Sequence, residues 1–371
     1  MTESSADLEH LRGRLLRFAE KEAAGISPLY EHLARHAAED DDITGLLGAA
    51  QPGFGAPTLL FAAVHRALQM RPFHELANYY PSVGGSYGVD EGTWPAFRSF
   101  VADNAERIRE LVATRTTQTN EVRRAAVLYP AVALAAKQAR GAIGLLEVGT
   151  SAGLLLGIDR YSYRYQTEQA GQLAAGPAKA PVGLHCALEL GPGAQLPAIP
   201  KRLAVGARIG LDRNPVDLAD EDAYAWLEAC IWADQPERAR LFTVAAAAQR
   251  KDPPELVRGD AVDDLAAAAK RIPESLPLVV MTSSAVAYLG ERRQAFLDAL
   301  GELSRRRPVW WVSQEGYQVG LELLLPGRED LKPTNSSAFG VIGLVRWQDG
   351  KPEARALAKA GLHGQRLVWL G

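Results

Sequence analysis

The stretch LLEVGTSAGLL, at residues 145–155, decides the fold class of this chain. An apolar run ending in an acidic residue is followed by a turn of small residues and a second apolar run, which predicts a buried strand, a tight turn and an apolar helix. Small residues let a ligand approach the backbone of such a turn, and the helix N-terminus adds a partial positive charge. Glu147, at the carboxyl end of the strand, suits hydroxyl or ammonium donors better than phosphate.

From residue 126 onward, short apolar runs alternate with helical stretches. This alternation predicts an α/β domain with a Rossmann-like, mostly parallel seven-stranded sheet. The last two runs have only a short polar connection, so we expect them to pair antiparallel. The runs lie at residues 142–148, 205–211, 255–257, 276–281, 308–312, 341–347 and 366–370.

Two further regions lie outside this alternation. Residues 161–202 begin with tyrosines at every second position, which predicts an inserted β-ribbon after the first helix of the sheet domain. Residues 1–125 show mostly helical spacing of apolar residues and predict an α-helical N-terminal domain that acts as a lid or binds substrate. The sequence therefore predicts two domains, a helical domain at residues 1–125 and an α/β sheet domain at residues 126–371, with the insertion at residues 161–202 of the second domain.

Composition and simple sequence patterns give no support to several classes of protein. The chain has 371 residues, 47% of them hydrophobic and 23% charged, and a formal net charge of -3. A near-neutral chain of this kind lacks the excess of basic residues that is typical of proteins that bind nucleic acid. Cys186 and Cys230 lie too far apart for a zinc motif, and no metal site is predicted. Without an 18-residue apolar run or a signal peptide, we expect a cytoplasmic protein with no membrane partner.

The turn at residues 149–153 also matches the G-x-S-x-G pattern of α/β-hydrolases. That resemblance implies Ser151 as a nucleophile, with His363 as a late base and an aspartate as the third member of a triad. The five-residue pattern fixes only three positions, and the chain shows no HGGG-type oxyanion loop.

A second resemblance extends over some 240 residues. The segments EVGTSAG (147–153), IGLDRNP (209–215), VRGDA (257–261) and LVVMTSSAVAYL (278–289) resemble, in order, motifs of the class I S-adenosylmethionine (SAM) methyltransferase superfamily. The chain as a whole is similar to an uncharacterised bacterial family of that superfamily with an added helical N-terminal part. The resemblance implies SAM as cofactor and a binding site that comprises Glu147, Gly149, Thr150, Ser151, Gly153, Asp212, Arg213, Asp260, Ala261, Ser283 and Ser284.

In that superfamily an acid after the second strand binds the ribose hydroxyls, and an Asp-Ala pair after the third strand contacts the adenine. The ribose acid usually follows the glycine turn by about 20 residues, whereas Asp212 follows Gly153 by 59. The Asp212 assignment therefore requires the insertion to loop out before the second strand. Ser151 replaces the middle glycine of the turn. The N-P-P-Y or D-P-P-Y signature of amino-methylating members is absent, which disfavours a DNA or RNA methylase.

Several polar residues are candidates for binding and catalysis. Gln118, Asn120 and Arg123 are expected to cover the cofactor pocket and hold a carboxylate, although Thr119 or Asn120 can equally cap the following helix. Glu315, after the fifth strand, is the candidate base or amine-recognising carboxylate. Tyr80 and Tyr288 offer aromatic faces to a sulfonium, and Tyr80 is also a candidate substrate contact.

The leading hypothesis is a SAM-dependent methyltransferase that acts on a small molecule as a monomer or homodimer. The first alternative is a SAM-consuming lyase or cyclase that releases methylthioadenosine and a cyclic amino acid. The others are the hydrolase with Ser151 as nucleophile and a non-catalytic binding protein with the SAM fold.

Overall fold

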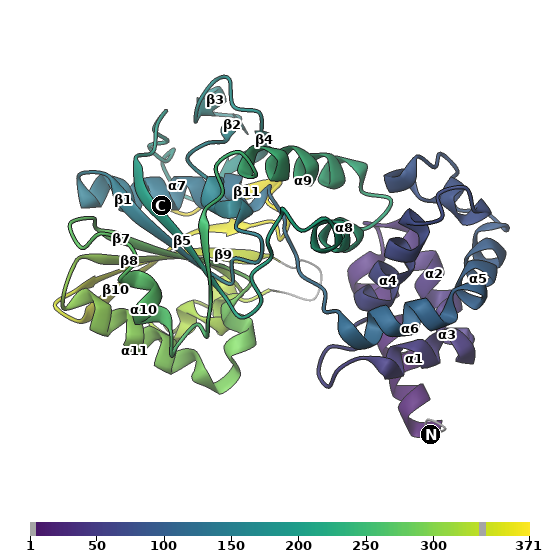
Figure 1. Ribbon diagram of the computed structural model, residues 1–371. Helices are drawn as coiled ribbons and strands as arrows, with labels where there is room; N and C mark the ends of the chain where they lie inside the picture. The colour runs from purple at the N-terminus through teal and green to yellow at the C-terminus, as the bar shows by residue number, and fades with distance from the viewer. Residues whose placement is uncertain (1–4, 334–338) are drawn as a thin grey trace. The chain divides into compact units, whose positions relative to one another are not determined.

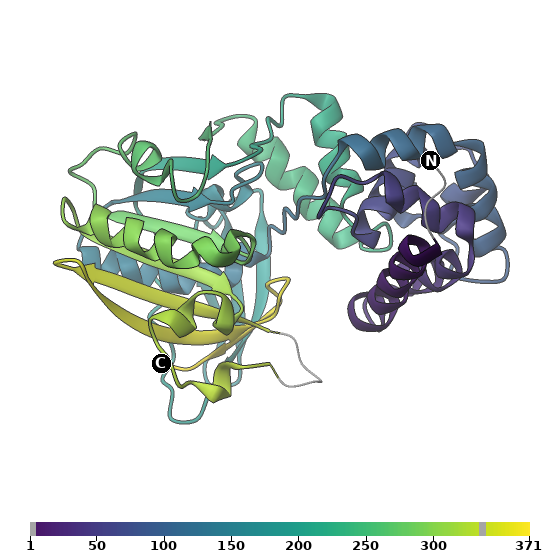
Figure 2. The same cartoon turned by 90° about the horizontal axis from the view of Figure 1, so that it is seen from below.

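The computed structural model describes residues 5–333 and 339–371. The chain forms two compact units, each built from two separate segments. One unit comprises Met1–Thr119 and Ala219–Phe242, and the other comprises Asn120–Leu218 and Thr243–Gly371. Residues 219–242, which the sequence analysis places in the sheet domain, thus belong to the helical unit. Figures 1 and 2 show the two units from two directions.

The first unit is α-helical. From residue 5 onward, where the structure describes it, its N-terminal segment carries six α-helices, and its second segment adds α8 and the beginning of α9. Ser27 and Asp40 cap α2 and α3 by accepting hydrogen bonds from the backbone N–H groups of Tyr30 and Ile43. The helices are α1 (Ser5–Phe18), α2 (Pro28–Glu39), α3 (Asp41–Leu46), α4 (Pro57–Gln69), α5 (Thr93–Asp103), α6 (Ala105–Thr114), α8 (Glu221–Ala229) and α9 (Pro236–Gln249).

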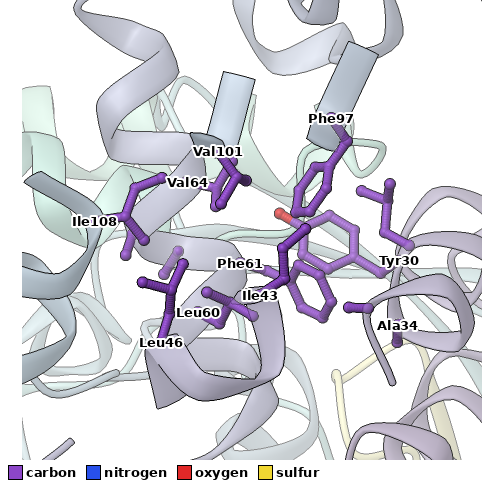
Figure 3. Packing of buried hydrophobic residues seen from close by; sticks show 14 of the residues in the cluster. Tyr30, Ala34, Ile43, Leu46, Leu60, Phe61, Val64, Phe97, Val101 and Ile108 are labelled. Atoms are coloured by element: carbon purple, nitrogen blue, oxygen red, sulfur yellow. The ribbon is translucent and has the colours of Figure 1, made fainter. Parts of the chain in front are cut away.

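A continuous apolar core holds this unit together. Tyr30, Phe61 and Phe97 lie together in it, as Figure 3 shows, with ring centroids 5.0 and 6.2 Å apart in successive pairs. The second segment closes the core, because Trp232 stacks on Tyr30 and the Asp234 carboxylate accepts a 2.8 Å hydrogen bond from the Ser27 hydroxyl. Residues 219–242 are therefore part of the helical packing.

The second unit is built on an eleven-stranded mixed sheet in the order β3-β2-β4-β11-β10-β9-β8-β7-β1-β5-β6. The predicted α/β class is correct at this level, but the predicted seven-stranded Rossmann-like sheet is wrong. The strands are β1 (Ile143–Val148), β2 (Ser162–Thr167), β3 (Gly171–Ala175), β4 (Gly183–Leu190), β5 (Val205–Asp212), β6 (Glu255–Arg258), β7 (Leu278–Ser283), β8 (Val309–Glu315), β9 (Gly340–Gln348), β10 (Lys351–Ala360) and β11 (Arg366–Trp369).

Two features account for the additional strands. The insertion does not stay apart as a ribbon, because β4 pairs in parallel with β11 and brings β2 and β3 into the same sheet. The chain between the last two predicted strands contains β10, which separates β9 from β11 and pairs antiparallel with both. The predicted antiparallel pairing of those last two strands is therefore also wrong.

Helices cover both faces of this sheet (Figure 1). Trp310 and Trp311 are consecutive on β8 and therefore point to opposite faces. The Trp310 indole donates a hydrogen bond to Gln138 on α7 (Arg124–Ala139), whereas Trp311 packs edge-to-face on Phe296 of α11 (Arg293–Ser304). The face with Trp311 is also covered by α10 (Leu265–Ala269). The central strands are thus buried on both sides.

The segment after β1 differs from the prediction in a way that affects the site. Instead of an apolar helix, the chain forms only the short 3-10 turn η5 (Leu154–Gly157) before it enters β2. A single short turn cannot align enough peptide dipoles to act as a helix N-terminus. The predicted helix-dipole contribution to anion binding is therefore absent from this turn.

Candidate functional site

The carboxyl ends of β1, β5, β7 and β8 meet at one edge of the sheet, because these four strands are parallel. We call this edge, with the loops that follow these strands, the carboxyl edge. From β1, the sheet extends through β5 and β6 on one side and through β7 and β8 on the other. The order of the parallel strands therefore reverses at β1, and ligands of open α/β sheets bind in the crevice at such a point.

The turn after β1 has left-handed backbone at Gly149, Ser151 and Gly153, with φ of 76°, 51° and 74°. Gly149 is exposed at the end of the strand, so its backbone is accessible from solvent. A Cβ atom on Gly149 would lie 2.5 Å from the Cβ of Ala285, in the loop after β7. The packing of the two loops therefore requires glycine at position 149 even without a ligand.

Asp212, the last residue of β5, lies directly against this turn. One carboxylate oxygen accepts a 2.7 Å hydrogen bond from the Ser151 N–H, and the other accepts a 2.7 Å hydrogen bond from the Asn214 N–H. The insertion does loop out before β5, as the Asp212 assignment requires, since its strands join the far edge of the sheet. Asp212 is partly exposed, and each of its oxygens retains acceptor capacity.

Asn120 covers the turn from the other side. Its amide nitrogen donates a 3.0 Å hydrogen bond to the Ser151 hydroxyl, and its amide oxygen accepts a 3.3 Å bond from the Ala152 N–H. The alternative that Thr119 or Asn120 caps the following helix is wrong, because α7 begins only at Arg124 and its N-cap residue, Arg123, makes no side-chain cap hydrogen bond. Asn120 instead holds Ser151 in its left-handed conformation, which costs a serine free energy.

Glu147 is buried beneath the turn and is 3% exposed. Its carboxyl group accepts a 2.8 Å hydrogen bond from the Thr150 hydroxyl. Burial raises the pKa of Glu147 from 4.5 to about 8; the Thr150 hydrogen bond opposes this rise and the Asp212 carboxylate adds to it. At neutral pH this group is therefore a protonated acid that supports the turn.

Glu315, at the end of β8, fixes the loop after β7. Its carboxylate accepts hydrogen bonds of 3.0 and 3.2 Å from the N–H groups of Ala285 and Val286. Burial raises the pKa of Glu315 to about 7, although these bonds oppose the rise. Ser284, which precedes these residues, is exposed and has a φ of 55°. Because Glu315 is 5% exposed, its contacts are those of a positioning residue.

Two residues that sequence reasoning missed join this network. Arg124 donates a 3.0 Å hydrogen bond to the Leu362 carbonyl and a 3.4 Å bond to the Ser283 hydroxyl. Gln314 accepts a 3.2 Å bond from the same hydroxyl. The available signal was an arginine at the start of an apolar helix, but only the fold shows that Arg124 is 8% exposed and reaches β7.

Among the acidic candidate residues, Asp260 accepts the largest number of hydrogen bonds. It accepts hydrogen bonds from Arg213, from Arg292 and from the N–H groups of Val262 and Asp263, with distances of 2.7 to 3.3 Å. Partial burial acts to raise the pKa of Asp260, but these donors together lower it to about 2. With its acceptor positions occupied, Asp260 holds two arginines and is a poor contact for an adenine amine. Ala261 beside it is partly buried.

The remaining candidates differ in their surroundings. Tyr80 belongs to the helical unit and is fully buried in its core, so it presents no surface to a substrate. Gln118 lies in the helical unit as well. Tyr288 belongs to η6 (Val286–Arg292) and is 81% exposed, so its ring is available to solvent. Arg123 immediately precedes α7 and is partly exposed.

The contacts of Ser151 also bear on the hydrolase alternative. The hydroxyl accepts a hydrogen bond from the Asn120 amide nitrogen, a donor that cannot take up a proton as a base. The His363 ring lies 3.7 Å from the Glu121 carboxylate. These contacts place Ser151 in the support of the turn and pair His363 with an acid from another segment.

The chain belongs to the family described as "Uncharacterized protein conserved in bacteria (DUF2332)", whose model matches residues 12–369. The matched range includes segments of both compact units. No curated protein matches the chain. Within residues 5–333 and 339–371, no helix has the length and apolar character needed to cross a membrane.

Proposed function

We propose that the carboxyl edge binds S-adenosylmethionine and that this protein is a SAM-dependent methyltransferase acting on a small-molecule acceptor. The observation that carries the proposal is the position of Asp212. Its partly exposed carboxylate is oriented by two backbone N–H groups beside the accessible backbone of Gly149. An acid at this position, next to a small-residue turn, is suited to accept hydrogen bonds from two neighbouring ribose hydroxyls.

The donor set fits such a cofactor in part. Asp212 would hold the ribose, the Gly149 backbone would lie against the cofactor, and exposed Ser284 would face its reactive end. Asp260 is occupied by arginines, so the adenine would depend on other contacts. When bound, SAM supplies an activated methyl group that needs in-line alignment with the acceptor.

Hydrogen bonds within the protein fix the two loops of the carboxyl edge in one conformation. Asn120 and Asp212 hold the turn after β1 from two sides, and Glu315 holds the loop after β7. Both loops are thereby fixed before a ligand arrives, which reduces the entropy lost on binding. Protonated Glu147 beneath the turn adds no second negative charge next to Asp212 at neutral pH. The SAM-consuming lyase remains the alternative, since it would use the same cofactor contacts.

Calorimetric titration with SAM and with S-adenosylhomocysteine tests the proposal. We expect micromolar binding by the unmodified protein and a loss of at least about tenfold in Asp212→Ala, since a hydrogen bond to a charged group contributes ~1.5–3 kcal/mol. Asp298→Ala, which removes an exposed aspartate from α11, is the matched control and should bind like the unmodified protein.

Circular dichroism of each variant establishes that the fold is intact. Absence of binding to both ligands, or equal binding by Asp212→Ala, would refute the proposal. Once binding is found, incubation with SAM and a panel of small acceptors separates the two chemistries. S-Adenosylhomocysteine as the nucleoside product indicates methyl transfer, and methylthioadenosine indicates the lyase.

A further inference from the structure

We propose that the sheet unit has a second ligand site, in a cavity beside η5, and that this site binds a small amphipathic carboxylate. The cavity has a volume of about 430 Å³ and lies among η5, β5 and the C-terminal part of α9. We call it the η5 cavity. This volume lies within the ~300–1,000 Å³ range of ordinary small-molecule pockets. The proposal does not depend on SAM binding at the carboxyl edge.

The cavity follows from two local features of the sequence. The chain makes only a four-residue turn after β1, where α/β units usually place a whole helix over the sheet. The segment of α9 that faces this space is rich in alanine, including Ala245, Ala247 and Ala248. Short side chains on α9 and a missing helix after β1 together leave the space unfilled.

The walls of the η5 cavity are mainly apolar. Leu156 comes from η5, Val244 from α9, and Pro181 and Pro254 from two loops. Transfer of an alkyl or aromatic group from water into such surroundings contributes ~25 cal/mol per Å² of buried apolar surface. These walls therefore favour the tail of a ligand and do not by themselves select its head group.

The charged residues of the cavity select the head group. Arg160, Arg208 and Lys251 line it, and none of the lining residues is acidic. Arg208 is ion-paired with Asp159 at 3.1 Å, and Arg160 is ion-paired with Asp252. Neither of these aspartates lines the cavity.

Counting the three cations of the cavity and the two aspartates paired with them, the cavity has a net charge of one positive unit. Two of the three cations are matched by an aspartate, while Lys251 is exposed and has no acidic partner among the described residues. A single uncompensated cation among the residues that line an apolar cavity is complementary to a monocarboxylate with an apolar tail. A dianion such as a phosphate monoester would find only half of its charge compensated.

The test is calorimetric titration of the full-length protein with octanoate and dodecanoate. Octanol provides the same tail without the charge, and acetate provides the charge without the tail. We expect both fatty acids to bind, dodecanoate more tightly, and octanol to bind more weakly than octanoate. Acetate should give no signal.

Two variants locate the site, each with a matched control. Lys251→Met should weaken octanoate binding about threefold, the size of a solvent-exposed ion pair, and leave octanol binding unchanged. Lys137→Met, at an exposed lysine on α7, is its control. Ala248→Trp should fill the cavity and abolish the binding of both octanoate and octanol. Ala267→Trp, at an exposed alanine on α10, should not.

Each contrary result overturns the proposal. If no fatty acid binds the unmodified protein, the η5 cavity is not a carboxylate site. If octanol binds as tightly as octanoate, the cations do not select the head group. If Ala248→Trp binds like the unmodified protein while retaining its melting temperature, the ligand occupies another place.

Discussion

Replacement of Glu147 by glutamine should change how the stability of the protein depends on pH. Glutamine has nearly the same shape as a protonated glutamate and can still accept the hydrogen bond from Thr150, but it cannot ionise. In the unmodified protein, the folded state holds a proton on Glu147 up to a pKa of about 8, whereas the unfolded chain releases it near 4.5. E147Q removes this difference.

The sign and the size follow from proton linkage. Between these two values the folded state binds more protons than the unfolded state, so the free energy of unfolding falls as pH rises. Below pH 4.5 both states are protonated, and above pH 8 both are ionised, so the loss is confined to that window. The pKa differs by about 3.5, and a difference of one corresponds to ~1.36 kcal/mol, which makes the full loss about 5 kcal/mol.

Urea unfolding followed by tryptophan fluorescence, at several values between pH 5 and 8.5, measures this loss. We expect E147Q to gain stability steadily relative to the unmodified protein as pH rises, by several kcal/mol over the range. Glu315 titrates in both proteins, so its contribution cancels in the comparison. Glu353→Gln, at an exposed glutamate on β10, is the control and should show no such trend. A stability difference that stays constant with pH would refute the burial of Glu147 as a neutral acid.

The remaining predictions concern packing and hydrogen bonding. Glu315→Ala should lower the free energy of unfolding by about 2–4 kcal/mol, because it leaves the buried N–H group of Val286 and the partly buried N–H group of Ala285 without their acceptor; a loss below about 0.5 kcal/mol in urea unfolding would contradict this. Gly149→Ala should destabilise by at least about 1 kcal/mol through its positive φ and by more through the clash with Ala285. In the double variant Gly149→Ala/Ala285→Gly, the clash is relieved, so the part of the stability loss that comes from the clash should be regained and the part that comes from the positive φ should remain. If the loss in the double variant, measured by calorimetry, equals the sum of the losses in the two single variants, the contact between positions 149 and 285 is refuted. Tyr80→Phe should be neutral or stabilising by about 1 kcal/mol, because the Tyr80 hydroxyl is buried without a hydrogen-bond partner among the described residues; a lower melting temperature would reveal a bond to that hydroxyl.

Strong local patterns predicted the central strands well. The apolar runs that became β1, β7, β8 and β9 are mostly buried on both sides, and such strands stand out as continuous apolar segments. Strand β10 was not predicted, because the segment KPEARALAKA is rich in alanine and charge and has no intrinsic preference for a strand. It forms a strand because β9 and β11 pair with it on either side.

The prediction of the site was also uneven, for a physical reason. Glu147, Gly149 and Ser151 lie in one continuous motif, so their proximity follows from the chain itself. The contact of Asp212 with that motif spans 61 residues and depends on where the insertion goes. Arg124 and Gln314 were left out of the predicted binding set because nothing in their local sequence shows that both contact the Ser283 hydroxyl.

By itself, the sequence determined the alternation of strands and helices, the small-residue turn after the first strand and the helical character of the N-terminal part. These are local properties, since periodicity and turn chemistry act over a few residues. Only the tertiary structure decided that the insertion extends the sheet, that residues 219–242 complete the helical unit, that burial raises the pKa of Glu147, and that Asp260 holds two arginines. Strand order, burial and charge pairing depend on contacts between residues that are distant in sequence, and local sequence patterns do not predict such contacts.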